Sequence, residues 1–369
     1  MPSSDDATGP LVSVVIPLYN DHRTITLCLE SVYAQWYRPI EVVVVDDAST
    51  DDSAARAAAF PCRLITAATN GGPGASRNLG VRHSRGDIIF FLDADMTVQP
   101  DAVGNAVALL TSGLAADGTG YGAVFGIPDM VPLLPETVVG HCRILQYHYW
   151  RSSSEGPTSA GGYAMGAIRR SVFEEAGWFR EALRQTEVID HGERVARRHP
   201  MLLTSAISGR MSDESRVWPL LRKAYLRSHL RVPFYIDRGK AMRGLETGNR
   251  AVAAGLAGLT LASMPAVVWT PPAGVVTALL LAGFIATDPG QYRFVVRERG
   301  WRYLLPFTLL HLAVNSTVAA GLGTGLIRWA LSRRFRALYR GGATGREGPH
   351  RATRPASSSA STTATWTPR

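Results

Sequence analysis

Two apolar runs that each end in aspartates place the strongest constraint on what this chain can fold into. They read IEVVVVDD at residues 40–47 and GDIIFFLDAD at residues 86–95. Branched and aromatic residues without polar alternation indicate strands that are buried on both faces of a sheet. A third run, LVSVVIP at 11–17, has the same character. The sequence therefore predicts three buried strands in the N-terminal part of the chain.

Helical patterns separate these strands, at residues 24–36, 52–59 and 74–84. Strands that alternate with helices build a parallel sheet through right-handed crossovers, which is the α/β class. In open sheets of this kind, ligands bind beyond the carboxyl ends of the strands. We therefore expect an α/β fold with a mostly parallel central sheet, and a binding site at the aspartates that follow the strands.

The C-terminal part is more apolar than an ordinary soluble domain. Residues 251–269 and 273–286 contain no charged side chain, and 304–331 contains only Arg328. Because about 20 apolar residues span a bilayer, the first two stretches are expected to form a membrane hairpin within a membrane-embedded region at 251–331. Three buried core helices are the alternative. Hydrophobic residues make up 46% of the chain and charged residues 19%, which favours contact with lipid.

Basic residues flank these apolar stretches. Between residues 180 and 250 they outnumber acidic residues by 15 to 8, and the chain carries a net charge of +9. Residues 216–250 are predicted to form a basic amphipathic segment at the membrane interface, with a solvated basic helix as the alternative. A third full span would carry the basic cluster at 333–340 across the membrane, against the positive-inside rule, whereas a re-entrant or broken segment would not. Both arrangements remain open from the sequence.

The two ends of the chain are polar. Residues 1–10 are predicted to be flexible and contain neither the basic nor the apolar region of a secretory signal. Residues 332–369 are predicted to form a basic, disordered tail. We therefore expect the N-terminal domain on the cytoplasmic face of the cell membrane. The basic residues lack the pattern of a recognition helix or aromatic platform, so we assign them to lipid headgroups and expect no nucleic-acid partner.

Asp93 and Asp95 stand two residues apart at the end of a predicted strand. A turn there can direct both carboxylates at one hard divalent cation, which prefers oxygen ligands and bridges phosphates. A pair of turn-forming or helix-capping aspartates is the alternative. The spacing predicts a metal site at this edge of the sheet.

Four motifs occur in order along the chain: IPLYN at 16–20, VVVDDAST at 43–50, NGGPGASRNLG at 70–80 and FFLDAD at 90–95. Together they resemble the family 2 glycosyltransferases. The resemblance implies a GT-A fold over residues 11–215, followed here by membrane-associated helices. It implies that Asp93 and Asp95 hold Mg²⁺ or Mn²⁺ on the diphosphate of a nucleotide-sugar donor, and that the sugar is transferred with inversion.

The same resemblance implies roles for residues on the donor side. Asp47, together with Asp46, would bind the nucleoside, because a carboxylate accepts hydrogen bonds from a base or ribose. Tyr19, just after Pro17, would lie against the base, with a half-buried packing role as its alternative. Arg77 would offset phosphate charge, with a surface ion pair as its alternative.

A later segment, TEVIDHGERVARR at 186–198, resembles the part of the family that carries the catalytic base. The family's usual aspartate falls on Val188. On a helix that begins near residue 186, Glu187, Asp190 and Arg194 share one face, which we expect to point into the cleft, with Val188 pointing elsewhere. Glu187 is favoured as the base over Asp190, whose other role is a pair with Arg194 within the helix. A helix N-terminal acid is the alternative role for Glu187.

These expectations combine into one function with two alternatives. The first is a membrane-associated, metal-dependent, inverting glycosyltransferase whose acceptor is lipid-linked or amphipathic. The second is a polyprenyl-phosphate glycosyltransferase, whose phosphate acceptor is already ionised and depends less on a base. The third is a membrane-bound pseudoenzyme that binds nucleotide without turnover.

Overall fold

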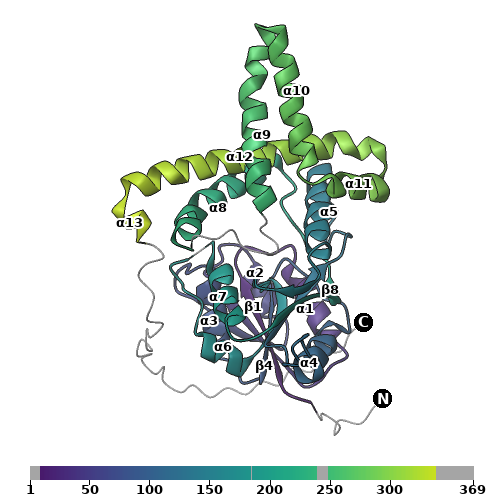
Figure 1. Ribbon diagram of the computed structural model, residues 1–369. Helices are drawn as coiled ribbons and strands as arrows, with labels where there is room; N and C mark the ends of the chain where they lie inside the picture. Colours follow the sequence, from purple (N-terminus) through teal and green to yellow (C-terminus); the bar gives the residue numbers. More distant parts are fainter. Residues whose placement is uncertain (1–8, 184, 239–247, 338–369) are drawn as a thin grey trace.

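The computed structural model describes residues 9–183, 185–238 and 248–337 (Figure 1). Most of the predicted flexible N-terminus at 1–10 and of the predicted tail at 332–369 lies outside the described residues. So does part of the predicted interfacial segment at 216–250.

An eight-stranded sheet forms the centre of the N-terminal part, in the order β3-β2-β1-β4-β7-β5-β8-β6. Strands β1 to β4 run parallel to their neighbours among themselves, and β5 runs parallel to β8. Strands β7 and β6 run antiparallel to their neighbours. The predicted α/β fold with a mostly parallel sheet is confirmed. The strands are β1 (Val12–Leu18), β2 (Ile40–Asp46), β3 (Arg63–Thr66), β4 (Ile88–Leu92), β5 (Ala123–Pro128), β6 (Gly156–Thr158), β7 (Met165–Arg169) and β8 (Met201–Gly209).

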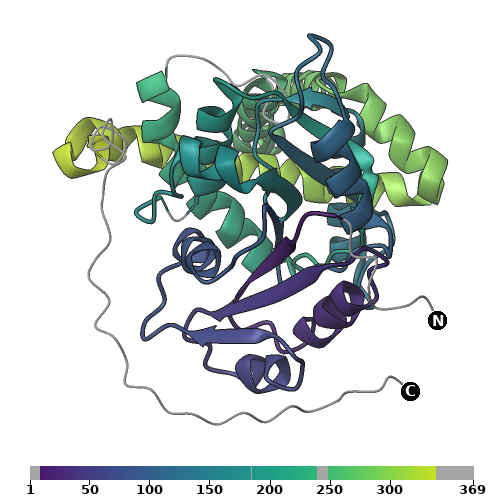
Figure 2. The same ribbon diagram turned by 90° about the horizontal axis from the view of Figure 1, so that it is seen from below.

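Alternate residues of the central strands pack into two separate hydrophobic cores, one on each face of the sheet. Val14 and Ile16 of β1 pack with one set of helices, whereas Val15 packs with another set on the opposite face. The strands at the N-terminal end of the chain, drawn in purple, lie between helices on either side (Figure 2). A strand covered on both faces needs apolar residues at successive positions, which explains the unbroken runs in the sequence. The first set comprises α1 (Ile25–Tyr33), α2 (Ser53–Ala57) and α4 (Ala102–Ser112), and the second α3 (Pro73–Arg82), α6 (Arg170–Ala176) and α7 (Glu187–Ala196).

The loops that follow β1 and β2 are bonded to each other. The backbone N–H of Asn20 donates to Ser49 Oγ at 3.1 Å, and the N–H of Thr50 donates to Asn20 Oδ1 at 2.8 Å. Asn20 adopts a positive φ of 56°, a left-handed conformation that asparagine tolerates better than most residues. The two loops therefore form one bonded unit at the carboxyl ends of neighbouring parallel strands.

A second layer of helices lies beside the sheet domain (Figure 1). Helix α5 (Val138–Ser152) reaches from the sheet domain to α11 (Pro289–Arg299), where Trp150 Nε1 donates to Gln291 Oε1 at 3.2 Å. Helix α8 (Val217–Arg238) packs along α12 (Leu304–Leu331), and the short α13 (Arg333–Arg336) follows. A Cβ at Gly321 of α12 would lie 2.6 Å from the backbone carbonyl oxygen of Tyr225 in α8, so only glycine permits this close approach of the two helices.

Helices α9 (Gly248–Ser263) and α10 (Pro271–Ala286) form a hairpin that projects away from the sheet domain (Figure 1). Thr277 Oγ1 of α10 donates to Ser263 Oγ of α9 at 2.9 Å. Large apolar side chains point outward along the hairpin. By length and composition, Arg250–Val268 and Trp301–Leu331 are each able to cross a membrane, and a bent pair formed by α10 and α11 would make a third candidate. The outward-pointing side chains include Val252, Leu259, Leu261, Val275, Val276 and Leu279.

Helix α12 is one unbroken helix of 28 residues. It runs across the base of the α9–α10 hairpin instead of alongside it (Figure 1), and Ser316 Oγ donates to the carbonyl of Ala257 in α9 at 3.0 Å. Two helices that cross in this way do not both follow the bilayer normal. Helix α12 is therefore not the broken segment that the sequence left open, and by length and composition it is able to cross a membrane.

Candidate active site

A cavity of about 660 Å³ lies at the carboxyl ends of β1, β2 and β4. It collects predicted site residues from well-separated parts of the chain, because these three strands are neighbours in the sheet. Two predicted residues, Asp46 and Asp190, do not line it. Those that do are Pro17, Tyr19, Asp47, Arg77, Asp93, Asp95 and Glu187.

Three carboxylates crowd one part of the cavity: Asp21, Asp93 and Asp95. Burial, followed by the negative charges of Asp93 and Asp21, raises the pKa of Asp95 to about 8. Burial and the charges of Asp93 and Asp51 raise the pKa of Asp21 to about 6. The sequence analysis did not identify Asp21, which stands at the end of the IPLYN motif without a distinctive pattern of its own.

These carboxylates fit a divalent cation. Among the described residues, none donates a hydrogen bond to the carboxylate of Asp95, and the like charges around it repel one another. A hard cation would replace that repulsion by attraction and supply the missing partner. The Asp93 and Asp95 pair predicted from the sequence is therefore chemically suited to Mg²⁺ or Mn²⁺, with Asp21 beside it.

The raised pKa values predict how metal binding depends on pH. An acid whose pKa rises on folding stabilises the fold only while it is protonated, so the metal-free protein loses this stability as the pH rises toward 8. Mn²⁺ binds the ionised carboxylates, so its stabilising effect should be larger at pH 8 than at pH 5.5, where protons compete. At a free concentration 100 times its Kd, it adds about 2.7 kcal/mol. Thermal unfolding with and without Mn²⁺ at both pH values measures this, and equal shifts, or a shift retained by Asp95→Asn, would contradict the site.

Asp47 organises the glycine-rich loop that precedes α3. Its two carboxylate oxygens accept the backbone N–H groups of Gly71 and Gly72, each at 2.8 Å. Gly72 has a φ of 88°, which is strained for any residue with a Cβ. This explains the glycine at that place in NGGPG. Asp47 remains on the cavity wall, where oxygen lone pairs not used by the loop can accept further hydrogen bonds.

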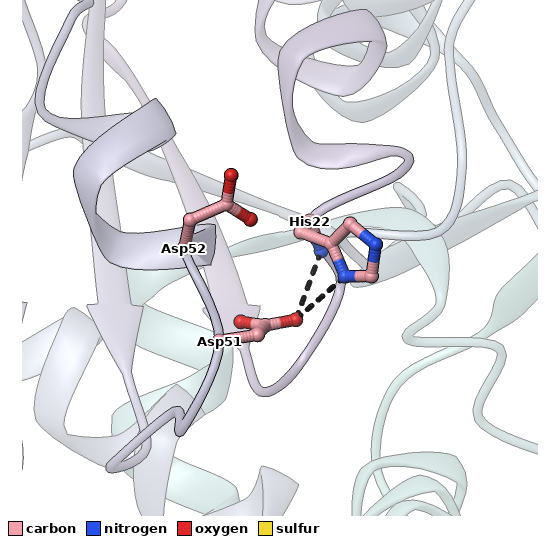
Figure 3. A group of neighbouring side chains, drawn as sticks. All are labelled: His22, Asp51 and Asp52. Carbon is pink, nitrogen blue, oxygen red and sulfur yellow. Dashed lines mark hydrogen bonds and ion pairs between the residues drawn. The ribbon is translucent and has the colours of Figure 1, made fainter.

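Asp46 is buried and accepts the backbone N–H of Ser49 at 3.1 Å. It therefore closes the turn after β2 and lies behind the cavity wall. Asp51, which directly follows the same motif, also supports a loop, because its carboxylate accepts a hydrogen bond from His22 Nδ1 at 2.8 Å (Figure 3). It also accepts the backbone N–H of Ser53 at 3.0 Å. Burial tends to raise the pKa of Asp51, but the hydrogen bonds from Ser53 and His22 lower it to about 2.

Arg77 lies between two carboxylates of the cavity. Its Nη2 contacts Asp93 Oδ1 at 2.7 Å, and its Nη1 contacts Glu187 Oε1 at 3.5 Å. Arg77 is 3% exposed, and its guanidinium stacks over Phe179 with 5.8 Å to the ring centroid. The predicted alternative of a surface ion pair is wrong, because the pair is buried. Arg77 links the predicted metal ligand to the predicted base.

Glu187 is the first residue of α7 and is 5% exposed. Burial raises its pKa, and the charge of Arg77 opposes this shift. Among the described residues, none donates a hydrogen bond to its second oxygen, Oε2. A buried carboxylate that lines a cavity, with a raised pKa and one oxygen without a hydrogen-bond partner, has the features of a general base.

Asp190 occupies a different environment from the one expected. It is completely buried, and its oxygens contact Arg180 at 3.2 Å and Arg194 at 3.0 Å. Asp190 and Arg194 therefore face the interior and the turn before α7, while Val188 lines the cavity. The expected common face of Glu187, Asp190 and Arg194 in the cleft is wrong, because the cavity meets only the first turn of the helix.

The cavity also contains residues that the sequence analysis did not single out as site residues. A group of arginines and aromatic residues comes from α5, α8 and the start of α9. These helices bring them together only in three dimensions, and no short motif links them. The group consists of Arg143, Tyr147, Trp150, Arg151, Arg227, Arg231 and Arg250.

Comparison with known proteins gives matches over the N-terminal part. Residues 13–176 match the model of the family described as glycosyl transferase family 2. The succinoglycan biosynthesis protein ExoO of Rhizobium meliloti is 46% identical over 95 residues, which are 25% of this chain and 27% of ExoO. The chondroitin synthase of Escherichia coli is 40% identical over 98 residues, 26% of this chain and 14% of that protein. The matches thus span only a small part of each relative.

Among solved structures, a mannosyltransferase from Pyrobaculum calidifontis in complex with GDP-Man and Mn²⁺ is 20% identical. The alignment covers 90% of this chain and 84% of that one, with a TM-score of 0.48. The family match covers β1 to β4 with their terminal aspartates, the strands that form the parallel part of the sheet. Residues 13–176 therefore match a family 2 glycosyltransferase domain, which has an α/β fold with a mostly parallel sheet here and is followed by apolar C-terminal helices.

Proposed function

We propose that this protein is a membrane-associated, metal-dependent, inverting glycosyltransferase, which moves a sugar from a nucleotide-diphosphate donor to a lipid-linked or amphipathic acceptor. The observation that carries the proposal is the single cavity that joins the Asp93 and Asp95 carboxylates, through Arg77, to the buried carboxylate of Glu187. A transferase of this type needs charge stabilisation for the leaving group and a base for the acceptor, and the two lie side by side here.

On the donor side, Asp47 accepts hydrogen bonds from the nucleoside, and the exposed ring of Tyr19, next to Pro17, lies against the base. Asp93 and Asp95 would hold the divalent cation, which would supply positive charge against the departing nucleoside diphosphate. Arg77 fixes the orientation of Asp93 and keeps a positive charge close to the same group. Asp46 does not contact the donor; it contributes only by closing the turn after β2 through its bond to Ser49.

On the acceptor side, Glu187 accepts the proton of the attacking hydroxyl at its unused oxygen. Its raised pKa brings it closer to neutral pH, where a base is most effective, and Arg77 keeps it ionised enough to act. Gly74 leaves room for this side chain, because a Cβ there would lie 3.0 Å from Glu187 Cγ.

Helices contact the membrane in two ways. The α9–α10 hairpin enters the bilayer, since Arg250–Val268 has about the length of the hydrocarbon core at 1.5 Å per residue. Helix α12, which crosses the base of the hairpin, lies along the membrane surface with α8 beneath it. This placement keeps the basic residues of α13 on the same side as the catalytic domain, the cytoplasmic side.

This placement predicts which positions a membrane-impermeant maleimide reaches in intact cells. A Trp269→Cys variant at the exposed tip of the hairpin should be labelled from outside. An Ala330→Cys variant, near the end of α12, should be labelled only after the cells are permeabilised. Labelling of Ala330→Cys from outside would mean that α12 crosses the membrane and would contradict the surface placement.

The activity itself is tested with purified full-length protein in detergent. The protein is incubated with UDP-, GDP- and dTDP-sugars in the presence of Mn²⁺ or Mg²⁺, and the release of nucleoside diphosphate is followed. Release from one donor class, suppressed by EDTA, supports the proposal. Binding of nucleotide without any turnover would identify a pseudoenzyme instead.

A further inference from the structure

The charged residues of the cavity wall come from two sets of elements. The carboxylates come from the loops after β1, β2 and β4 and from the first residue of α7. A group of arginines comes from α5, α8 and the start of α9, which belong to the layer of helices beside the sheet domain (Figure 1). They are Arg143, Arg151, Arg227, Arg231 and Arg250. We call these five residues the arginine end of the cavity.

Two of these arginines are held by neutral groups. Arg151 is 8% exposed; its Nη1 donates to the carbonyl of Gly126 at 3.1 Å and its Nη2 to Tyr147 Oη at 2.8 Å. Arg227 Nε donates to Gln185 Oε1 at 3.3 Å. In the described part of the chain, neither makes an ion pair with a carboxylate. Arg227 is exposed, whereas Arg151 is buried with no carboxylate of the described residues in contact. Removing the charge of Arg151 from water costs free energy, which an anionic ligand would recover.

The remaining contacts keep the arginine end in a fixed shape. Arg143 Nε contacts Asp213 at 3.2 Å, and Arg250 lies over the ring of Trp150 with 4.0 Å to its centroid. The pKa of Arg227 is lowered by its partial desolvation in the cavity and then by the positive charge of Arg231. Like charges held close together in this way form a preorganised site for an anion.

We propose that the arginine end binds the phosphate or diphosphate group of a lipid-linked acceptor. Guanidinium groups bind phosphate oxygens in pairs, so several arginines around one cavity suit a group with more than one negative charge. The inference rests on the proposed function, because it gives the acceptor of that transferase its chemical class.

The surroundings favour a lipid as the carrier of this group. The exposed side chains of Leu226 and Val252 belong to α8 and α9, the helices that also carry Arg227 and Arg250. Both belong to the helices that we place at the membrane, so an apolar tail can leave the cavity along them while its headgroup stays among the arginines. The phosphates of the donor would bind elsewhere in the cavity, at the cation held by the Asp93 and Asp95 carboxylates.

The test is direct binding of a polyprenyl phosphate to the full-length protein in detergent micelles, followed by tryptophan fluorescence, since Trp150 lies in the site. The uncharged polyprenol of the same length and inorganic pyrophosphate are measured in parallel. We expect the polyprenyl phosphate to bind at least tenfold more tightly than either. Equal binding of polyprenol would overturn the anion site, and equal binding of pyrophosphate would point to a soluble phosphate and overturn the lipid assignment.

Two variants of α8 test whether polyprenyl phosphate binds at the arginine end of the cavity. Arg227→Gln should weaken binding of polyprenyl phosphate roughly 10- to 100-fold, the effect of losing one charged hydrogen-bonding partner. Arg222→Gln, an exposed arginine of the same helix that does not line the cavity, is the matched control and should bind as wild type does. Equal losses in both variants would overturn the assignment, and thermal unfolding shows that each variant is folded.

Nucleoside diphosphate release by the wild-type protein without acceptor separates this inference from the proposed function. If the donor is hydrolysed but polyprenyl phosphate does not bind, only the acceptor assignment fails. If polyprenyl phosphate binds but no donor is hydrolysed, the proposed anion site is supported and the proposed transferase activity is contradicted.

Discussion

Replacement of Asp95 by asparagine is expected to lower metal-stimulated donor turnover by roughly 10²- to 10³-fold, the usual effect of losing a preorganised electrostatic stabiliser. The change removes one charge at nearly constant volume from a residue whose carboxylate has no hydrogen-bond donor among the described residues. Steady-state release of nucleoside diphosphate, titrated with Mn²⁺, measures the effect.

Asp52→Asn is the matched control for this experiment. Asp52 is exposed, pairs with Arg56 at 2.8 Å and does not line the cavity, so the same chemical change there should leave turnover as it was. Because Asp95 is destabilised by its neighbours, Asp95→Asn should also make the metal-free protein more stable at pH 8. Turnover in Asp95→Asn that equals wild type, or wild-type turnover unaffected by EDTA, would refute the metal site.

Replacement of Glu187 by glutamine should lower transfer to a hydroxyl acceptor by roughly 10²- to 10⁴-fold, the contribution of a positioned general base. The KM for the donor should change little, since Glu187 lies on the acceptor side of Asp93. In wild type the rate should fall at acidic pH, because protonation of Glu187 removes the base, and its raised pKa moves this fall toward neutral pH. The variant should lose this pH dependence together with its rate.

Two other acidic residues serve as controls for Glu187→Gln. Glu181→Gln, in which an exposed carboxylate accepts Asn78 Nδ2 at 3.0 Å outside the cavity, should retain activity. Asp190→Asn should instead lower the free energy of unfolding by about 1.5–3 kcal/mol, because it weakens hydrogen bonds to two arginines. Wild-type kcat in Glu187→Gln with a phosphate acceptor would show that the acceptor needs no base. With a hydroxyl acceptor, it would contradict the role of Glu187.

The sequence predicted three strands of the parallel half of the sheet, β1, β2 and β4, and the edge at which they end, for a physical reason. It did not predict β3, which has only four residues and is partly exposed. Each of β1, β2 and β4 is covered on both faces, so each appears as an unbroken apolar run, and the polar residues after it mark its carboxyl end. Asp47, Asp93 and Asp95 were found in this way. Strand β7 (Met165–Arg169) could not be, because its sequence MGAIR contains two small residues and an arginine among its five.

Other features depended on contacts between distant parts of the chain. The face that α7 turns to the cavity is set by the ion pairs of Asp190 with Arg180 and Arg194, which helical periodicity does not reveal. The crosswise course of α12 depends on its packing against α8 at Gly321. Composition identifies α12 as apolar, but only that packing determines its direction relative to the hairpin.

The measurement that tests the central claim most directly is mass spectrometry of the lipids after reaction. Full-length protein in detergent is incubated with Mn²⁺, a polyprenyl diphosphate that carries a sugar with free hydroxyl groups, and the nucleotide sugar that it hydrolyses. We predict a lipid product heavier by one glycosyl residue, formed by wild type and absent when EDTA is added or Asp95→Asn is used. Failure of the wild-type protein to consume any UDP-, GDP- or dTDP-sugar, with all lipids unchanged in mass, would contradict the assignment of this cavity to sugar transfer.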